Sequence, residues 1–114
     1  MIIFKICHRA EWEAAERDGL YNGSSKDRAD GFLHFSKAEQ LPETLRRYYT
    51  GIRDLVLVAV EADDLEKLKF EASRNGELFP HLYASLPVTS VRWTAPIVTN
   101  ADGTFTLPVD ASNK

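Results

Sequence analysis

The amino-acid sequence predicts a single α+β domain, in which a strongly bent, split β-sheet is covered by two or three short helices. The chain has 114 residues, of which 44% are apolar, and this is enough for one domain with one core. Segments with strand character outnumber segments with helical character. The helical segments gather in the first half of the chain, which favours an α+β fold. The domain is expected to span residues 1–109, followed by a frayed tail at residues 110–114.

The first thirty residues are predicted to form a strand, a helix and a loop. Residues 2–7 are apolar and β-branched, which favours a strand. Residues 10–18 have the apolar spacing of a short helix, and Gly19 follows at the position where helices commonly end. Residues 20–31 are polar and rich in turn-forming pairs, so we expect a loop there.

A short strand and a second helix are expected next. Residues 32–35 favour a strand, and Ser36 with Glu39 fits a capping box that would begin a helix. Pro42 suits the first turn of a restarted helix, and Gly51 is expected to end it. The apolar face of this helix would consist of Leu41, Leu45, Tyr48 and Tyr49.

The second half of the chain is predicted to be mainly strands. Residues 55–60 are apolar on both faces, which indicates a central strand. Residues 63–68 are expected to form one helical turn, and residues 69–73 a strand with Glu71 facing away from its apolar side. An Asn-Gly turn follows at residues 75–76. Further strands are expected at residues 82–83, 88–93, 97–99 and 104–107, the last two as a hairpin.

Charge and composition exclude several classes of function. The net charge is −3 at pH 7, so binding to duplex nucleic acid is not expected. A single cysteine, Cys7, excludes an internal disulfide and Cys-rich zinc sites. No His, Asp or Glu cluster has metal-ligand spacing, so no metal is expected. The longest apolar run is far shorter than the roughly 20 residues that span a bilayer, and a cytoplasmic protein without membrane contact is expected.

His34 and Ser36 are the first candidates for chemistry. Alternation along the strand places them on one face, while Leu33 and Phe35 anchor the other face in the core. The end of the strand meets the expected start of a helix, whose unpaired N–H groups favour a phosphate or carboxylate. The alternative is that Ser36 only caps the helix and His34 is a partly buried structural side chain.

His81 lies in a second candidate motif, Phe-Pro-His-Leu-Tyr at residues 79–83. Pro80 stiffens the backbone, and alternation places His81 and Tyr83 on one face. Such a pair can bind a ribose or a phosphate, stack on a base, or close the edge of a core. Glu71 could add a carboxylate to the site, or it could be a solvated strand residue.

These motifs resemble a bacterial family known as domain of unknown function 952. The resemblance rests on Gly-Phe-Leu-His-Phe-Ser at residues 31–36, on Gln40 a turn later, and on residues 79–83. It spans residues 2 to about 96 and also includes the strand at 55–60 and the Phe-Glu pair at 70–71. The family implies a small stand-alone cytoplasmic protein and no known reaction.

The order of elements is similar, more distantly, to the ADP-ribosyltransferase-type fold, nearest to its RNA 2′-phosphotransferase branch. The matching features are an early strand ending in His8, a helix closing at Gly19, the His-x-Ser element at 34–36, and the later Asn-Gly turn. This resemblance implies a cleft that holds NAD, used as cofactor or substrate. Its partner would be a small nucleotide-like ligand or a phosphorylated RNA end.

The resemblance also assigns expected roles to residues. His34 would hydrogen-bond ribose hydroxyls, Glu71 would stabilise a developing positive charge, and His81 would complete the catalytic set. The expected ligand-binding residues are Ser36, Gln40, Phe79, Tyr83 and His8. The chain's one Glu-x-Glu spacing, Glu11 and Glu13, falls in the first predicted helix, and no later Gln/Glu-x-Glu element offers a catalytic carboxylate. This favours the alternative of a non-catalytic nucleotide- or partner-binding module. A third alternative is a protein-interaction domain with Tyr48, Tyr49 and Trp93 as surface anchors.

Overall fold

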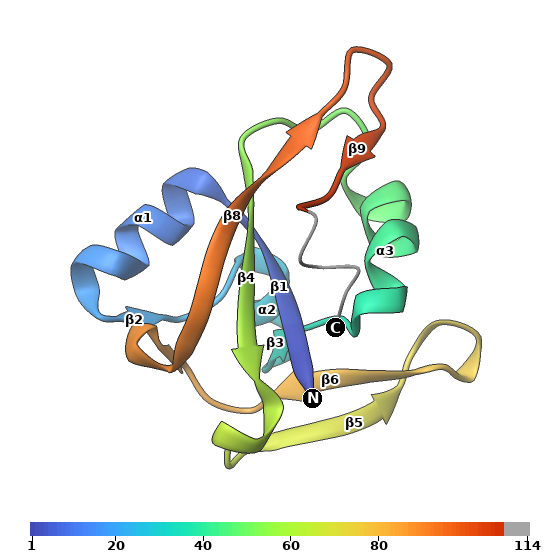
Figure 1. The fold of residues 1–114 in the computed structure, drawn as a ribbon. Helices are drawn as coiled ribbons and strands as arrows, with labels where there is room; N and C mark the ends of the chain where they lie inside the picture. The colour runs from blue at the N-terminus through green and yellow to red at the C-terminus, as the bar shows by residue number, and fades with distance from the viewer. Residues whose placement is uncertain (109–114) are drawn as a thin grey trace.

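The fold is organised around a four-stranded antiparallel sheet in the order β1-β4-β8-β9 (Figure 1). A computed structural model describes residues 1–108 of the chain, so the tail expected at 110–114 lies outside the described residues. The strands of this sheet are β1 (Ile2–His8), β4 (Leu55–Glu61), β8 (Val91–Thr99) and β9 (Phe105–Thr106).

Strand β4 is the centre of the molecule. Every side chain from position 55 to 60 is buried, and β1 and β8 pair with it on either side. Its alternate residues enter two separate apolar clusters, one on each face of the sheet. The predicted central strand with two buried faces is therefore confirmed.

Two smaller sheets complete the curled, half-barrel arrangement. Strands β2 (Leu20–Tyr21) and β7 (Leu86–Pro87) form a pair. Strands β3 (Leu33–His34), β6 (Leu78–Leu82) and β5 (Leu68–Ala72) form a three-stranded sheet in that order. In Figure 1, β5 and β6 run across the lower end of the long strands. The predicted α+β class and bent, split sheet are confirmed.

Two α-helices cover opposite faces of the large sheet (Figure 1). Helix α1 (Arg9–Asp18) packs on the first cluster through Trp12 and Ala15. Helix α3 (Leu41–Tyr48) packs on the second cluster through Leu41 and Leu45. Short 3-10 helices lie at η1 (Ala38–Gln40), η2 (Ala62–Asp64), η3 (Arg74–Gly76) and η4 (Val88–Ser90).

A third helix, α2 (Ser25–Asp30), lies where a loop was predicted. Ser24 caps it, because the Asp27 amide donates to Ser24 Oγ while the Ser24 amide donates to Asp27 Oδ2. The prediction was wrong because a six-residue helix is too short to show an apolar stripe. Its buried residue is a charged one, Asp27, so hydrophobic periodicity could not reveal it.

The capping box predicted at Ser36 and Glu39 is also wrong. The Ser36 backbone instead pairs with Phe4 of β1 through two hydrogen bonds of 2.8 and 2.9 Å. The cap lies one residue later, where the Lys37 amide donates to the side chain of Gln40. Long-range pairing with β1 keeps residue 36 extended and delays the start of the helix.

Other boundaries differ from the prediction for identifiable reasons. Helix α3 ends at Tyr48 and not at Gly51, and Tyr48 is exposed instead of belonging to the apolar face. Strand β6 begins at Leu78 and runs through Pro80. The Pro80 carbonyl accepts from the Phe35 amide, one residue beyond β3, so the missing N–H of Pro80 falls where β3 has already ended.

The remaining predicted elements shift by a few residues. The helical turn expected at 63–68 is η2, and residues 88–90 form η4 instead of the start of a strand. The strands expected at 88–93 and 97–99 are parts of the single strand β8, and the closing hairpin with β9 is confirmed. Tyr49 and Trp93, expected as surface anchors, pack partly buried against the second cluster.

Substitution of Gly23 tests how closely α2 packs against this residue. Its φ is +106°, and a Cβ there would lie 2.8 Å from Asp27 Cβ and 2.8 Å from Leu33 Cδ2. Gly31 also has a positive φ of +89° but has open space around it. We expect Gly31→Ala to lower the free energy of unfolding by about 1–2 kcal/mol through backbone strain alone. Gly23→Ala should lower it by about a further 1–3 kcal/mol because atoms must move apart.

Denaturant unfolding of the two variants measures this difference directly. Equal losses of stability in Gly23→Ala and Gly31→Ala would show that α2 does not pack against Gly23 as described.

Candidate functional site

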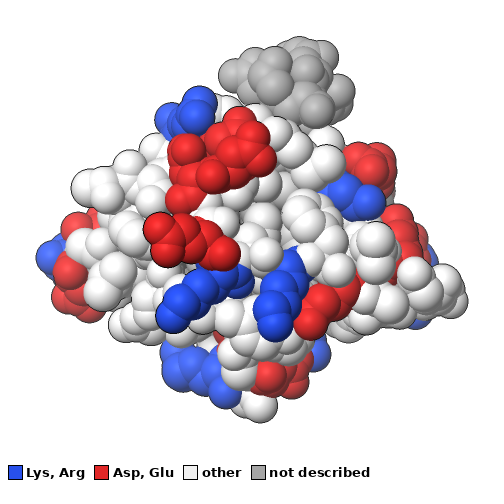
Figure 2. Space-filling view, turned by 90° about the horizontal axis from the view of Figure 1, so that it is seen from below, with Lys and Arg blue, Asp and Glu red and all other residues white. Residues whose placement is uncertain are grey.

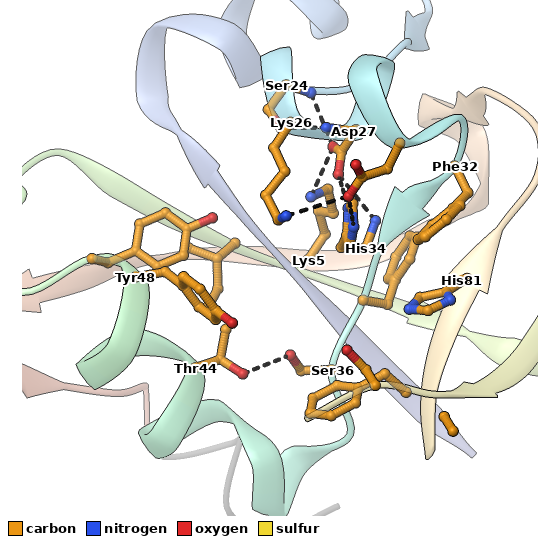
Figure 3. A pocket seen from close by; sticks show the side chains of 17 residues that line it. Lys5, Ser24, Lys26, Asp27, Phe32, His34, Ser36, Thr44, Tyr48 and His81 are labelled. Carbon is orange, nitrogen blue, oxygen red and sulfur yellow. Dashed lines mark hydrogen bonds and ion pairs between the residues drawn. The ribbon is translucent and has the colours of Figure 1, made fainter. Parts of the chain in front are cut away.

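A pocket of about 290 Å³ opens between α2, β1, β3, β6 and α3 (Figure 3). Segments from both halves of the chain therefore contribute to its wall. The polar and aromatic side chains that line it include Lys5, Lys26, Asp27, Asp30, Phe32, His34, Ser36, Thr44, Tyr48, Phe79 and His81.

His34 and His81 meet in this pocket because β3 and β6 pair in register. The two residues are direct cross-strand partners, so their side chains leave the sheet on the same face. Their ring centroids are 5.6 Å apart in an edge-to-face arrangement. The ring of Phe32 stacks on His81 at 4.1 Å and lies 4.6 Å from His34. The two motifs selected from the sequence thus form one cluster.

Asp27, a buried residue, fixes the position of His34 from the interior of the protein. Its side chain is 2% exposed and that of Lys5 is 4% exposed, and the two form an ion pair at 3.0 Å. Asp27 Oδ2 also accepts from the Ser24 amide at 2.9 Å. Asp27 Oδ1 accepts from the His34 amide at 3.1 Å and contacts His34 Nδ1 at 2.5 Å. Four donors from three segments therefore converge on one buried carboxylate.

These contacts determine the charge of Asp27 and the orientation of the ring. Burial opposes ionisation of Asp27, but the hydrogen bond from His34, the charge of Lys5 and the Ser24 amide together hold its pKa well below the usual range. An ionised carboxylate only accepts hydrogen bonds, so Nδ1 of His34 must be the donor. The other ring nitrogen, Nε2, then faces the pocket.

Asp30 lies on the pocket side of the same ring. Its Oδ2 is 2.9 Å from His34 Nε2 and 3.3 Å from Lys26 Nζ. The hydrogen bond from Lys26, together with the contact to His34, lowers the pKa of Asp30. Unlike Asp27, the Asp30 side chain is 38% exposed, so its contacts are open to solvent and to ligands.

Glu71 holds the second histidine in a similar way. Its Oε1 accepts from His81 Nδ1 at 2.8 Å and from the Tyr83 hydroxyl at 2.7 Å. The hydrogen bond from His81, followed by that from Tyr83, lowers the pKa of Glu71, and the same contact raises the pKa of Tyr83. Glu71 therefore shares a face with His81, whereas Phe70 on the other face of β5 is exposed. The predicted alternation, with Phe70 on one face of this strand and Glu71 on the other, is confirmed.

Two hydroxyl groups lie at the opposite side of the pocket from α2 (Figure 3). Ser36 is buried, and its Oγ lies 3.5 Å from Thr44 Oγ1 of α3. Because the Ser36 backbone is paired with β1, the hydroxyl is held at a fixed place beside the ring of Phe79 and the histidines.

Four of the residues selected from the sequence do not line this pocket: Glu71, Gln40, Tyr83 and His8. Gln40 is buried and ties η1 to β6, since its amide nitrogen donates to the Leu78 carbonyl at 2.8 Å. Tyr83 reaches the site through its hydrogen bond to Glu71 and through its ring, whose centroid lies 5.2 Å from that of Phe32. His8 lies at the exposed end of β1, with its ring centroid 6.3 Å from that of Tyr49.

Sequence reasoning missed Lys5, Asp27 and Asp30. The sequence carried a signal for Lys5, because a lysine inside an apolar strand must bury its charge beside a partner. The Ser-x-x-Asp spacing at residues 24–27 was a signal for Asp27. No sequence pattern connects Lys5 with Asp27, since their pairing arises only from the way α2 packs on β1.

Two further findings concern residues 1–108 as a whole. Within them, no group of three His, Cys, Asp or Glu side chains could hold a metal ion, and none of the helices is long and apolar enough to cross a membrane. On the face seen from below, over β5 and β6, basic and acidic side chains of the described residues are interspersed (Figure 2).

The buried carboxylate makes a testable contribution to stability. At pH 7, Asp27→Asn should lower the free energy of unfolding by about 3–5 kcal/mol, because Lys5 is left buried without a counter-charge. The pKa of Asp27 is lowered by folding, so its contribution is complete above the unfolded value of about 3.9 and is lost as the pH falls below it. The gap between wild type and Asp27→Asn should therefore narrow below about pH 4.

Denaturant unfolding at pH 7, 4 and 3 tests this, with the exposed Asp18→Asn as control. A gap that stays constant over this range, or no gap at pH 7, would contradict the assigned ionisation of Asp27.

The comparisons with known proteins agree on one family. Residues 6–94 match the family model described as "Protein of unknown function (DUF952)". The crystal structure of protein CC0527 from Caulobacter crescentus is similar, with a TM-score of 0.93 and 47% identity over 98% of this chain and 99% of that chain. The solution NMR structure of CC0527 has a TM-score of 0.82 and 50% identity over 90% of each chain. No curated protein matches the chain.

The family match spans most of the chain and includes both histidine motifs. It confirms the first resemblance found in the sequence, whereas the more distant likeness to ADP-ribosyltransferases stays a prediction. The chain therefore belongs to the DUF952 family of proteins of unknown function.

Proposed function

We propose that the protein binds a small nucleotide of the NAD or ADP-ribose type in this pocket and acts there as a transferase-like enzyme on the ribose. One observation supports this above all: two histidines far apart in the sequence share the pocket, and each is held at Nδ1 by a carboxylate. Such a contact orients an imidazole through Nδ1. At His34, the other nitrogen, Nε2, is then engaged by the exposed carboxylate of Asp30, which a ligand group can replace.

The groups in the wall suit the parts of a nucleotide. The histidine nitrogens and the hydroxyls of Ser36 and Thr44 can hydrogen-bond to ribose hydroxyls. The Lys26 ammonium can pair with a phosphate, and the ring of Phe79 can stack on a base. The volume of about 290 Å³ lies just below the roughly 300–1,000 Å³ typical of small-molecule sites. It therefore suits one nucleotide half.

The reaction breaks the bond between the ribose C1 and the nicotinamide nitrogen of NAD as substrate. Nicotinamide leaves as a neutral molecule with the electron pair, and positive charge develops on the ribose. An acceptor hydroxyl then bonds to C1, and its proton passes to His81 Nε2 as general base. His34 holds the ribose hydroxyls during this step.

Glu71, the candidate from the sequence, lies outside the pocket and is engaged by His81 and Tyr83. We therefore assign Glu71 a positioning role, in which it keeps the proton of His81 on Nδ1 and Nε2 ready to accept.

A non-catalytic binding module is the second candidate. The observation in its favour is that both carboxylates of the pocket are already paired with lysines, Asp27 with Lys5 and Asp30 with Lys26. A paired carboxylate stabilises a new positive charge less well, which weakens the case for ribosyl transfer but not for binding.

Nicotinamide release from NAD, measured beside a binding isotherm for NAD and ADP-ribose, distinguishes the two candidates. We expect His34→Ala and His81→Asn each to lower turnover by on the order of 10²-fold or more. The surface variant Glu13→Gln should turn over like the wild type.

Binding of NAD or ADP-ribose without turnover in the wild type would replace the enzyme by the binding module. If neither nucleotide binds, or if both histidine variants turn over normally, the proposal fails.

A further inference from the structure

We infer that Lys26 and His34 form an anion subsite in the pocket, which Asp30 fills in the free protein and which a phosphate group of the ligand takes over on binding. This inference rests on the proposed function, since it names the group by which a nucleotide would be held. It goes beyond that function by assigning Asp30 the place of a competing internal anion.

The geometry places two donors around one oxygen. His34 Nε2 lies 2.9 Å from Asp30 Oδ2, and Lys26 Nζ lies 3.3 Å from the same atom. A phosphoryl oxygen at this position would meet both donors at hydrogen-bond distance, and the remaining phosphate oxygens would extend into the pocket. Figure 3 shows both donors converging on this point from α2 and β3.

Asp30 can leave this position, whereas Asp27 cannot. Asp27 is buried and receives four hydrogen bonds or ion-pair contacts. Asp30 is partly exposed, and its pairing with the exposed Lys26 is of the kind that adds little to stability. Releasing Asp30 to solvent therefore costs little.

Helix stability does not explain why an aspartate is found here. Asp30 is the last residue of α2, and the carbonyls at a helix end favour a cation over a carboxylate. The side chain instead turns towards His34 and Lys26, where it balances the charge of Lys26 and contacts Nε2 of His34. The same role would be performed by a bound phosphate, which brings more negative charge and more acceptor oxygens.

The test compares AMP with adenosine, which differ only in the phosphate monoester. Calorimetric affinities are measured for wild type, Asp30→Asn and Lys26→Gln. Asp18→Asn is the matched control, because Asp18 also ends a helix directly before a glycine with positive φ. Thermal unfolding of each variant confirms that it is folded.

The expected result is a gain in AMP affinity of roughly tenfold in Asp30→Asn, the size of one charged contact. Adenosine affinity should stay within about twofold in that variant, and Lys26→Gln should reduce the preference for AMP. Asp18→Asn should match the wild type for both ligands.

Unchanged or weaker AMP binding in Asp30→Asn would overturn the inference, while the proposed function would stand if NAD or ADP-ribose binds to the wild type and NAD is turned over. Binding of inorganic phosphate identifies the opposite case, in which the subsite exists but the proposed function is wrong. If no nucleotide binds but Asp30→Asn binds phosphate more tightly than wild type, the subsite stands and the proposed function fails. If phosphate binds no better to Asp30→Asn either, both fail.

Discussion

The ion pair between Lys5 and Asp27 is the interaction on which the pocket depends. A lysine in the middle of β1 points into the first core, where an unpaired charge would be strongly unfavourable. Helix α2 supplies the counter-charge, and the helix is itself held by the mutual capping of Ser24 and Asp27. Buried ion pairs often contribute less stability than apolar packing would. The clearest consequence of the Lys5–Asp27 pair concerns position, because the same Asp27 carboxylate fixes the ring of His34.

The two histidines have the same kind of support but different surroundings. His34 depends on a carboxylate inside the protein, whereas His81 depends on Glu71, whose side chain is 37% exposed. The cross-strand register of β3 and β6 sets their separation, and Phe32 keeps both rings in place. One histidine is thus rigidly oriented from the core, and the other is oriented from the surface. This asymmetry suits different roles, with His34 binding and His81 transferring a proton.

The sequence predicted the parts of this arrangement that follow from local pattern. The apolar run of β4 showed a central strand, and strand alternation placed His34 on the face opposite Leu33 and Phe35. Prediction from the sequence failed where tertiary contacts override local preference, as at Ser36, which pairs with Phe4 instead of capping a helix. Asp27 was missed because its helix is short and its partner, Lys5, lies on a distant strand. The charges of the pocket could therefore be recognised only from the fold.

The central claim is that ionised Asp27 holds the proton of His34 on Nδ1 and so directs Nε2 towards the pocket. Long-range ¹H–¹⁵N NMR of the His34 ring tests it directly, because a ring nitrogen has different shifts when protonated and unprotonated. The account predicts a protonated Nδ1 in the wild type and a weaker preference for a proton at this nitrogen in Asp27→Asn. An unprotonated Nδ1 in the wild type, or an unchanged spectrum of His34 in the variant, would contradict it.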